Sequence, residues 1–190
     1  QWGPPDFLIN GAGGNDPRAS TSDEFHEPKK PLEPGGKSFF DLDPAGFRHV
    51  FDLNFLGTFL VTQIFSKDMV TTGKGAIVNI SSMSGLTPLT KVAAYSAAKA
   101  AVSNFTQWLA VHMAQVYSPQ IRVNAIAPGF INTEMTARLP EKGKETVLTR
   151  IALKRYGNPE EVAELAAFLA SDRASYISGQ VIGIDGGMIS

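Results

Sequence analysis

Ser82, Tyr95 and Lys99 are the residues whose types and spacing best fit proton-transfer chemistry. Tyr95 and Lys99 stand four residues apart in an alanine-rich run with strong helix propensity, so both side chains lie on one helix face, one turn apart. Ser82 follows the apolar run 76–80, which is typical of a buried strand. In open α/β sheets the ligand crevice lies at the carboxyl end of such strands.

The three side chains suit general acid–base catalysis. A free phenol has a pKa of about 10, and a nearby ammonium group favours the phenolate and lowers that pKa. Tyr95 could then pass a proton to or from a substrate oxygen, while Ser82 hydrogen-bonds the same oxygen. Lys99 could also hold a sugar hydroxyl of a cofactor. The alternative is that Tyr95 and Lys99 are a surface pair on an ordinary helix.

Strands and helices alternate along the chain, which indicates an α/β fold with a parallel sheet. The predicted strands are short apolar runs that end in turn residues, at 6–10, 76–80, 121–127 and 179–187. The predicted helices run from Asp43 to Val70, from the Tyr95 region to about Gln115, and from Asn158 to about Ala170. Asp43 and Asn158 each precede a proline, which is the signature of a helix start.

The pattern serine, twelve residues, tyrosine, three residues, lysine resembles that of the short-chain dehydrogenase/reductases, and Ser82, Tyr95 and Lys99 match it. The resemblance implies a Rossmann-like, doubly wound parallel sheet in three α/β/α layers. It implies hydride transfer between NAD or NADP and a carbonyl or secondary alcohol. Tyr95 would be the acid/base, Ser82 would orient the carbonyl oxygen, and Lys99 would lower the pKa of Tyr95; Tyr95 and Lys99 would also contact the cofactor.

The resemblance implies further site residues. Asn54 would bind a water linked to Lys99; the alternative is a satisfied core amide, since a buried asparagine must be hydrogen-bonded. A motif beside the cofactor's adenosine half is matched by Asn10, Gly11, Ala12 and Gly13, with Gly11 in place of the family's second asparagine. A loop that contacts the nicotinamide carboxamide is matched by Pro128, Gly129, Ile131 and Thr133.

Residues 1–190 are expected to form the C-terminal two-thirds of one such domain. The family begins with a strand, a Gly-rich phosphate-binding turn and a helix, then a selector for NAD or NADP, and none of these is present in the chain. Residues 15–43 are interpreted as a loop insertion that borders the substrate or forms a solvated flap. Residues 134–157 correspond to the family's substrate lid, whose basic side chains would meet an anionic substrate or simply face solvent.

Two groups of the family share features with this chain. Residues 7–130 resemble the fructuronate reductases (D-mannonate oxidoreductases), and residues 133–187 resemble the 3-oxoacyl-carrier-protein reductases. A sugar acid such as fructuronate or mannonate is therefore the favoured substrate, and a 3-oxoacyl thioester is the alternative. A third hypothesis is a non-catalytic remnant that serves in oligomerisation or binding.

The composition limits the classes of binding partner that we expect. The 190 residues are 43% hydrophobic and 18% charged with a net charge of −1, which gives no reason to propose nucleic acid or an anionic membrane. There is no cysteine, and His26, His49 and His112 lie far apart, so we expect no metal site. No apolar run reaches the ~20 residues of a membrane span, and we expect a cytoplasmic protein. In the family, the helices of Asn54 and Lys99 commonly form a dimer face, which implies a homodimer or homotetramer.

Overall fold

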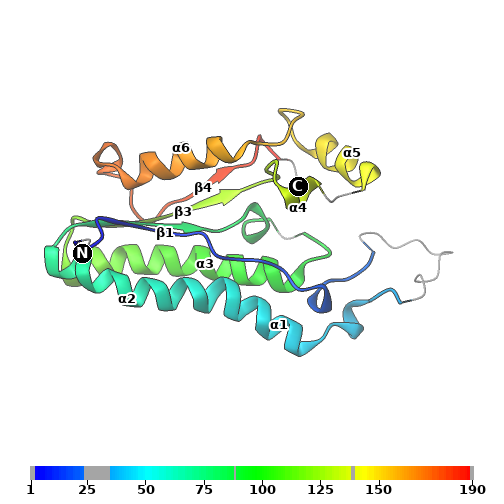
Figure 1. The fold of residues 1–190 in the computed structure, drawn as a ribbon, viewed down its shortest axis with the longest axis horizontal. Helices are drawn as coiled ribbons and strands as arrows, with labels where there is room; N and C mark the ends of the chain where they lie inside the picture. Colours follow the sequence, from blue (N-terminus) through cyan, green and yellow to red (C-terminus); the bar gives the residue numbers. More distant parts are fainter. Residues whose placement is uncertain (1–2, 24–34, 88, 138–139, 189–190) are drawn as a thin grey trace.

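The computed structural model describes residues 3–23, 35–87, 89–137 and 140–188, which form a four-stranded parallel sheet between two layers of helices (Figure 1). The strands lie side by side in chain order: β1 Phe7–Asn10, β2 Gly75–Ile80, β3 Ile121–Pro128 and β4 Val181–Ile184. The helices are α1 Pro44–Phe51, α2 Gly57–Thr72, α3 Ala93–His112, α4 Glu134–Ala137, α5 Glu141–Arg150 and α6 Pro159–Ala170. The predicted three-layer α/β fold is confirmed, and each predicted strand is present.

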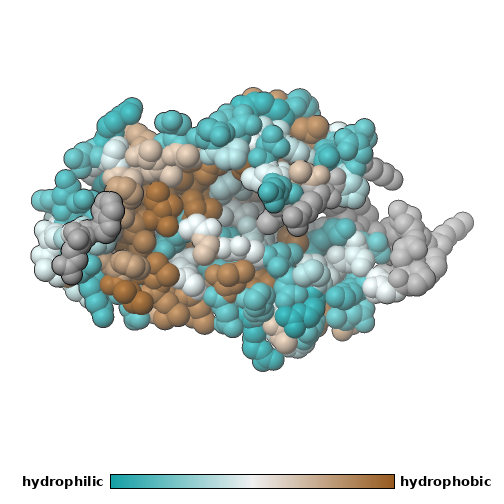
Figure 2. Space-filling view, in the orientation of Figure 1, coloured by the Kyte–Doolittle hydropathy of each residue, from teal (hydrophilic) through white to brown (hydrophobic). Residues whose placement is uncertain are grey.

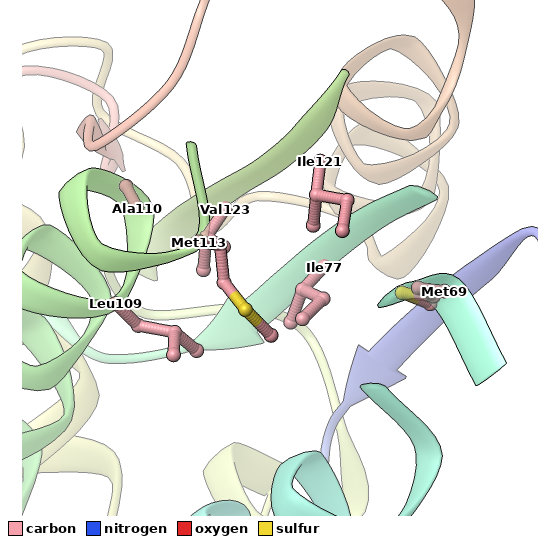
Figure 3. Packing of buried hydrophobic residues seen from close by; sticks show 7 residues of the cluster. All are labelled: Met69, Ile77, Leu109, Ala110, Met113, Ile121 and Val123. Carbon is pink, nitrogen blue, oxygen red and sulfur yellow. The ribbon is translucent and has the colours of Figure 1, made fainter. Parts of the chain in front are cut away.

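The alternation of side chains along β2 divides the core into two halves. Ile77 points to the layer of α2 and α3, while its neighbour Val78 points to α6. The α2/α3 half is drawn in Figure 3, where the strand side chains meet those of the helices: Met69, Ile77, Leu109, Ala110, Met113, Ile121 and Val123. The α6 half is built around Val78, Ile126, Ala166, Leu169 and Ala174. Because both faces of β2 and β3 are covered, these strands are buried almost throughout.

The β1 edge of the sheet is partly uncovered. Leu8 packs against the α2/α3 half of the core, but the adjacent Phe7 and Ile9 are 57% and 44% exposed. Hydrophobic residues gather over this edge and over the α2 side of the molecule (Figure 2). The apolar character of β1 is thus that of an internal strand, although β2 is the one strand paired with it in the described chain.

The helix predicted from Asp43 to Val70 is interrupted by one wide turn. Asp43 caps α1 as predicted, since its carboxylate accepts the backbone N–H of Ala45 at 2.8 Å. A π-helical turn, Asp52–Leu56, then separates α1 from α2. Such turns insert one extra residue and are often found at functional sites. Asn54 lies at the centre of this turn.

Candidate active site

Ser82, Tyr95 and Lys99 meet at the carboxyl end of β2. Ser82 begins a short 3₁₀ turn, Met83–Gly85, directly after the strand. This turn lies against α3, because a Cβ on Gly85 would stand only 2.7 Å from the main-chain carbonyl carbon of Lys99. Tyr95 and Lys99 share one face of α3, with the Lys99 ammonium 5.7 Å from the centroid of the Tyr95 ring.

The Lys99 ammonium is buried. The residue is 3% exposed, and its Nζ donates to the main-chain carbonyl of Ile80 at 2.8 Å. An ammonium has three donors, and this is the one hydrogen bond that Nζ makes among the described residues. Two N–H groups therefore remain for a ligand or water.

Burial sets the pKa values of the pair. It lowers the pKa of Lys99 from 10.5 to about 8. It also raises the pKa of Tyr95, while hydrogen bonding with Ser82 acts in the opposite direction. The lowered Tyr95 pKa expected from the nearby ammonium is therefore not met in this structure, because removing the phenol from water disfavours the phenolate more strongly than its neighbours favour it.

Asn54 is fully buried and holds the loop after β1. Its Nδ2 donates to the carbonyls of Gly14 and Val50, each at 2.7 Å, and its Oδ1 accepts the Gly14 N–H at 3.1 Å. Both amide donors are thus used, and its side chain can bind a further water only through the second lone pair of Oδ1. A Cβ on Gly13 would lie 2.7 Å from this Oδ1 and 3.0 Å from the Lys99 Nζ, so the loop passes close to both side chains.

The loop predicted beside the adenosine divides into a buried and an exposed part. The Asn10 amide points into the fold, where its Nδ2 donates to Thr62 Oγ1 and Asn79 Oδ1, each at 2.8 Å. Asn79 extends this chain of hydrogen bonds, since its Nδ2 donates to Thr106 Oγ1 at 2.9 Å. The next three residues present accessible backbone: Gly11, Ala12 and Gly13. Asn10 therefore supports the sheet and α2, and the glycines offer the surface for a ligand.

The loop predicted beside the nicotinamide follows β3. Pro128 is the last residue of the strand, and the Gly129 N–H donates to Ile184 at 3.0 Å. A Cβ on Gly129 would stand 2.7 Å from the Cα of Asp185, so only glycine fits between the ends of β3 and β4. Ile131 pairs with Gly157, and Thr133 is exposed. Because β2 and β3 are parallel neighbours, this loop and Ser82 lie at the same edge of the sheet.

No cluster of three or more histidine, cysteine, aspartate or glutamate side chains suited to a metal ion occurs among the described residues. In the same part of the chain, no helix is both long and apolar enough to cross a lipid bilayer. His112 stacks on Trp108 with ring centroids 4.8 Å apart, and His26 lies outside the described residues.

Comparison with known proteins agrees with this geometry. The family model described as enoyl-(acyl carrier protein) reductase matches residues 1–189. The chain is 47% identical over 194 residues to an uncharacterized oxidoreductase of Haemophilus influenzae, covering 98% of this chain and 66% of that protein. The chain belongs to the short-chain dehydrogenase/reductase family.

Two further members show how closely the chain follows particular groups. A structure of a candidate D-mannonate oxidoreductase from Haemophilus influenza with bound NAD superimposes with a TM-score of 0.86 at 46% identity, covering 96% of this chain and 66% of that one. A 3-oxoacyl-[acyl-carrier-protein] reductase of Thermotoga maritima is 49% identical over 140 residues, covering 74% of this chain and 56% of that protein. This short-chain dehydrogenase/reductase chain thus spans just under two thirds of the length of its Haemophilus relatives.

Several residues of this short-chain dehydrogenase/reductase site escaped the sequence reasoning. Gly14 bonds Asn54 through both its N–H and its carbonyl, and Ile80 supplies the acceptor for Lys99. Ser84 lies 3.0 Å from Ser82 through their hydroxyls. The sequence does show the glycine pair after β1 and the serines on either side of Met83. Neither pattern predicts which atoms these residues will contact.

Proposed function

We propose that this protein is an oxidoreductase that transfers a hydride between a nicotinamide cofactor and a carbonyl or secondary alcohol. The observation that carries the proposal is the meeting of Ser82, Tyr95 and a buried Lys99 ammonium at the carboxyl end of β2. In the direction of reduction, Tyr95 gives its proton to the substrate oxygen as the hydride reaches the carbonyl carbon. In oxidation Tyr95 takes that proton back, and Ser82 hydrogen-bonds the oxygen in both directions.

The residues around Lys99 fit a nicotinamide dinucleotide. The buried ammonium has two donors free of partners among the described residues, as sugar hydroxyls require, and Gly11–Gly13 offer backbone that a ligand can approach closely. The loop Pro128–Thr133 would hold the carboxamide. When bound, the nicotinamide supplies or accepts the hydride. The NAD in the Haemophilus structure supports a cofactor of this class.

Asn54 and Lys99 would renew the Tyr95 proton. Both side chains lie against Gly13, and the Asn54 amide has an acceptor lone pair but no free donor. We therefore propose that Asn54 Oδ1 accepts a hydrogen bond from a water molecule. Lys99 would then pass the proton between that water and Tyr95. The tight bonds of Asn54 to the backbone support a fixed position for this water.

A sugar acid is the substrate that we favour. The chain is 46% identical to the candidate D-mannonate oxidoreductase over 96% of its length, whereas it is 32% identical over 97% to a solved 3-oxoacyl-[acyl-carrier protein] reductase from Brucella melitensis. The latter similarity keeps a 3-oxoacyl thioester as the second candidate. A non-catalytic role is the third, and the complete set of acid–base side chains argues against it.

Two segments would form the walls of the substrate site. The two described ends of the 15–43 segment are joined by backbone hydrogen bonds, and we call this junction the neck. In the neck, Ser22 N–H donates to the Lys37 carbonyl and Asp43 N–H donates to the Arg18 carbonyl. The neck is tied to the segment before α3 by a bond from Thr21 N–H to Lys91, 3.0 Å long. The lid, residues 134–157, carries α4 and α5 at the end of the molecule toward which the strands point (Figure 1). Residues 24–34 and 138–139 of these segments lie outside the described residues.

We also propose that the protein forms a homodimer or homotetramer through α2 and α3. Both helices carry large apolar side chains that are about half exposed or more, among them Leu60, Ile64, Phe65, Trp108 and Val111. Between the helices runs a groove of about 420 Å³ with Phe59, Phe105 and Trp108 in its lining. Contiguous apolar surface of this kind is typical of protein interfaces.

The test is a substrate panel with the enzyme expressed from its complete reading frame. Fructuronate, mannonate and an acetoacetyl thioester are assayed with each of NAD(H) and NADP(H). We expect turnover of the sugar acids and little of the thioester. The Tyr95→Phe variant should lose about 10²–10⁴-fold in kcat, because proton transfer contributes that much, while cofactor binding stays measurable by fluorescence.

Each result has a clear meaning. Turnover of the thioester alone would replace the favoured substrate with the second candidate. Absence of turnover with every substrate and cofactor, in a protein shown to be folded, would favour the non-catalytic hypothesis. A Tyr95→Phe variant that keeps most of its activity would overturn the role of Tyr95.

A further inference from the structure

Ser84 makes a pair of contacts to the Ser82 hydroxyl that the mechanism so far does not use. Its backbone N–H donates to Ser82 Oγ at 3.2 Å, and its own hydroxyl donates to the same atom at 3.0 Å. Ser84 is 2% exposed and Ser82 is 9% exposed, so bulk water does not compete strongly for these bonds.

These bonds restrict what Ser82 can do. A serine hydroxyl has one O–H donor and two lone pairs. The two bonds from Ser84 occupy both lone pairs, so Ser82 can accept no further hydrogen bond. Its single proton is left to donate. Without substrate it goes to the Tyr95 oxygen, where it lowers the Tyr95 pKa, and with substrate bound it can turn to the reacting oxygen beside Tyr95.

We propose that Ser84 is a positioning residue of the active site, which holds the Ser82 hydroxyl as a donor toward the reacting oxygen. The inference rests on the proposed function, because it concerns the oxygen that gains or loses the hydride-coupled proton. Donation into Ser82 Oγ also polarises its O–H bond, since successive hydrogen bonds strengthen one another.

The Ser84 hydroxyl is not needed to build the turn. The backbone bonds Gly85 N–H to Ser82, Leu86 N–H to Met83 and Thr87 N–H to Met83 have lengths of 2.8 to 3.0 Å and involve no Ser84 side-chain atom. The neighbouring Ser81 hydroxyl donates to the Lys99 carbonyl instead. Loss of the Ser84 hydroxyl should therefore change the orientation of Ser82 and leave the fold intact.

A substitution at Ser84 should also change the pKa of Tyr95. Hydrogen bonding with Ser82 lowers the pKa of Tyr95, so a Ser82 hydroxyl that is free to rotate would lower it less. The Tyr95 pKa in the variant would then be higher than in the wild type. For alcohol oxidation, in which Tyr95 acts as the base, the rising limb of the pH profile of kcat/KM, which reports the free enzyme, should move to higher pH.

The experiment compares three variants of the full-length enzyme. Ser84→Ala removes the donor, and Ser84→Cys keeps the shape of the side chain but has only a weak S–H donor. Ser96→Ala is the control, because Ser96 is 6% exposed, follows Tyr95 on α3, and its hydroxyl has no partner in the described part of the chain. Measured quantities are kcat, KM for substrate and cofactor, the pH–rate profile, the kinetic isotope effect with C4-deuterated cofactor, and the thermal midpoint.

We expect Ser84→Ala and Ser84→Cys to lower kcat about three- to tenfold, the usual range for one lost neutral hydrogen bond, with KM for the cofactor unchanged. Both should shift the pH limb upward and increase the isotope effect, while Ser96→Ala matches the wild type. If Ser84→Cys behaves as the wild type, or if both variants match Ser96→Ala in kcat and pH profile, Ser84 is not a positioning residue. An inactive wild-type enzyme would instead overturn the proposed function, and this inference with it.

Discussion

At the scale of single residues, the Lys99 ammonium is a buried charge beside Tyr95. It is 3% exposed, and burial lowers its pKa to about 8. The charged form is therefore disfavoured in the folded protein relative to the unfolded chain, where the pKa is 10.5. A residue that is costly to bury and yet holds a fixed place beside Tyr95 is typical of functional sites.

This burial predicts a pH dependence of stability. Between pH 8 and pH 10.5 the unfolded chain holds the Lys99 proton and the folded protein has lost it, so the free energy of unfolding should rise with pH in this window. The rise is at most about 3 kcal/mol, since one pKa unit corresponds to about 1.4 kcal/mol. Urea unfolding of the wild type and of Lys99→Met between pH 7.5 and pH 10 measures the difference.

The control for this prediction is Lys91→Met, which removes an exposed ammonium. Its free energy of unfolding should follow the wild-type pH dependence, whereas Lys99→Met should lose the rise. The window ends at pH 10 because Tyr95, with its raised pKa, acts in the opposite sense above that pH. A Lys99→Met variant with the wild-type slope would contradict the assignment.

At the scale of elements, the π turn between α1 and α2 joins the helical layer to the loop after β1. It places Asn54 where its amide bonds both the N–H and the carbonyl of Gly14, forty residues away in the chain. The same amide donates to Val50, one turn earlier. One side chain thus fixes the loop after β1 to the helical layer.

This arrangement predicts that Gly13 tolerates no side chain. In Gly13→Ala the new Cβ would lie 2.7 Å from Asn54 Oδ1 and 3.0 Å from Lys99 Nζ, so one of these groups must move. We expect a loss of about 1–3 kcal/mol in the free energy of unfolding, as for other overpacked sites, and a strong loss of activity. Thermal unfolding and the activity assay measure the two effects.

Gly3→Ala is the matched control, because nothing lies within 4 Å of a Cβ at that position. It should leave both quantities near their wild-type values. A Gly13→Ala protein as stable and as active as Gly3→Ala would show that the loop, Asn54 and Lys99 are not in close contact.

At the scale of the whole molecule, the two ends of the sheet differ in character. The carboxyl ends of the strands lie toward Ser82, toward residues 134–157, which we propose as the lid, and toward the neck of the 15–43 segment (Figure 1). Exposed apolar side chains gather along the β1 edge and over α2 and α3 (Figure 2), and a smaller set lies in the segments at the carboxyl ends: Phe39, Phe40, Leu86 and Leu153. Association through α2 and α3 would therefore leave the mouth of the site open.

A charge placed on the α2/α3 face should disrupt the proposed oligomer. Ile64 is 60% exposed, and Ile64→Glu would place a carboxylate where the partner's apolar surface should lie. We expect sedimentation velocity to show a shift to monomer at micromolar concentration. Tyr176→Glu changes a fully exposed aromatic side chain outside this face and should keep the wild-type assembly. If both variants sediment as the wild type does, the interface lies elsewhere.

The sequence alone was sufficient to predict the strands, the starts of the helices at Asp43 and Asn158, and the pairing of Tyr95 with Lys99 on one helix face. These features depend on short-range rules: alternation along a strand, caps such as Asp43, and the four-residue spacing of a helix. Ser82 could be placed because it follows an apolar run at a known end of the strand.

Only the tertiary structure decided how these residues are tuned. The direction of the Tyr95 pKa depends on how much water the packed sheet and helices exclude, which no local spacing reveals. The inward turn of Asn10 and the bonds between Asn54 and Gly14 depend on partners 40 or more residues away. Such contacts form only when distant elements pack, so the sequence determined which chemical groups are present, and packing determined which atoms they meet.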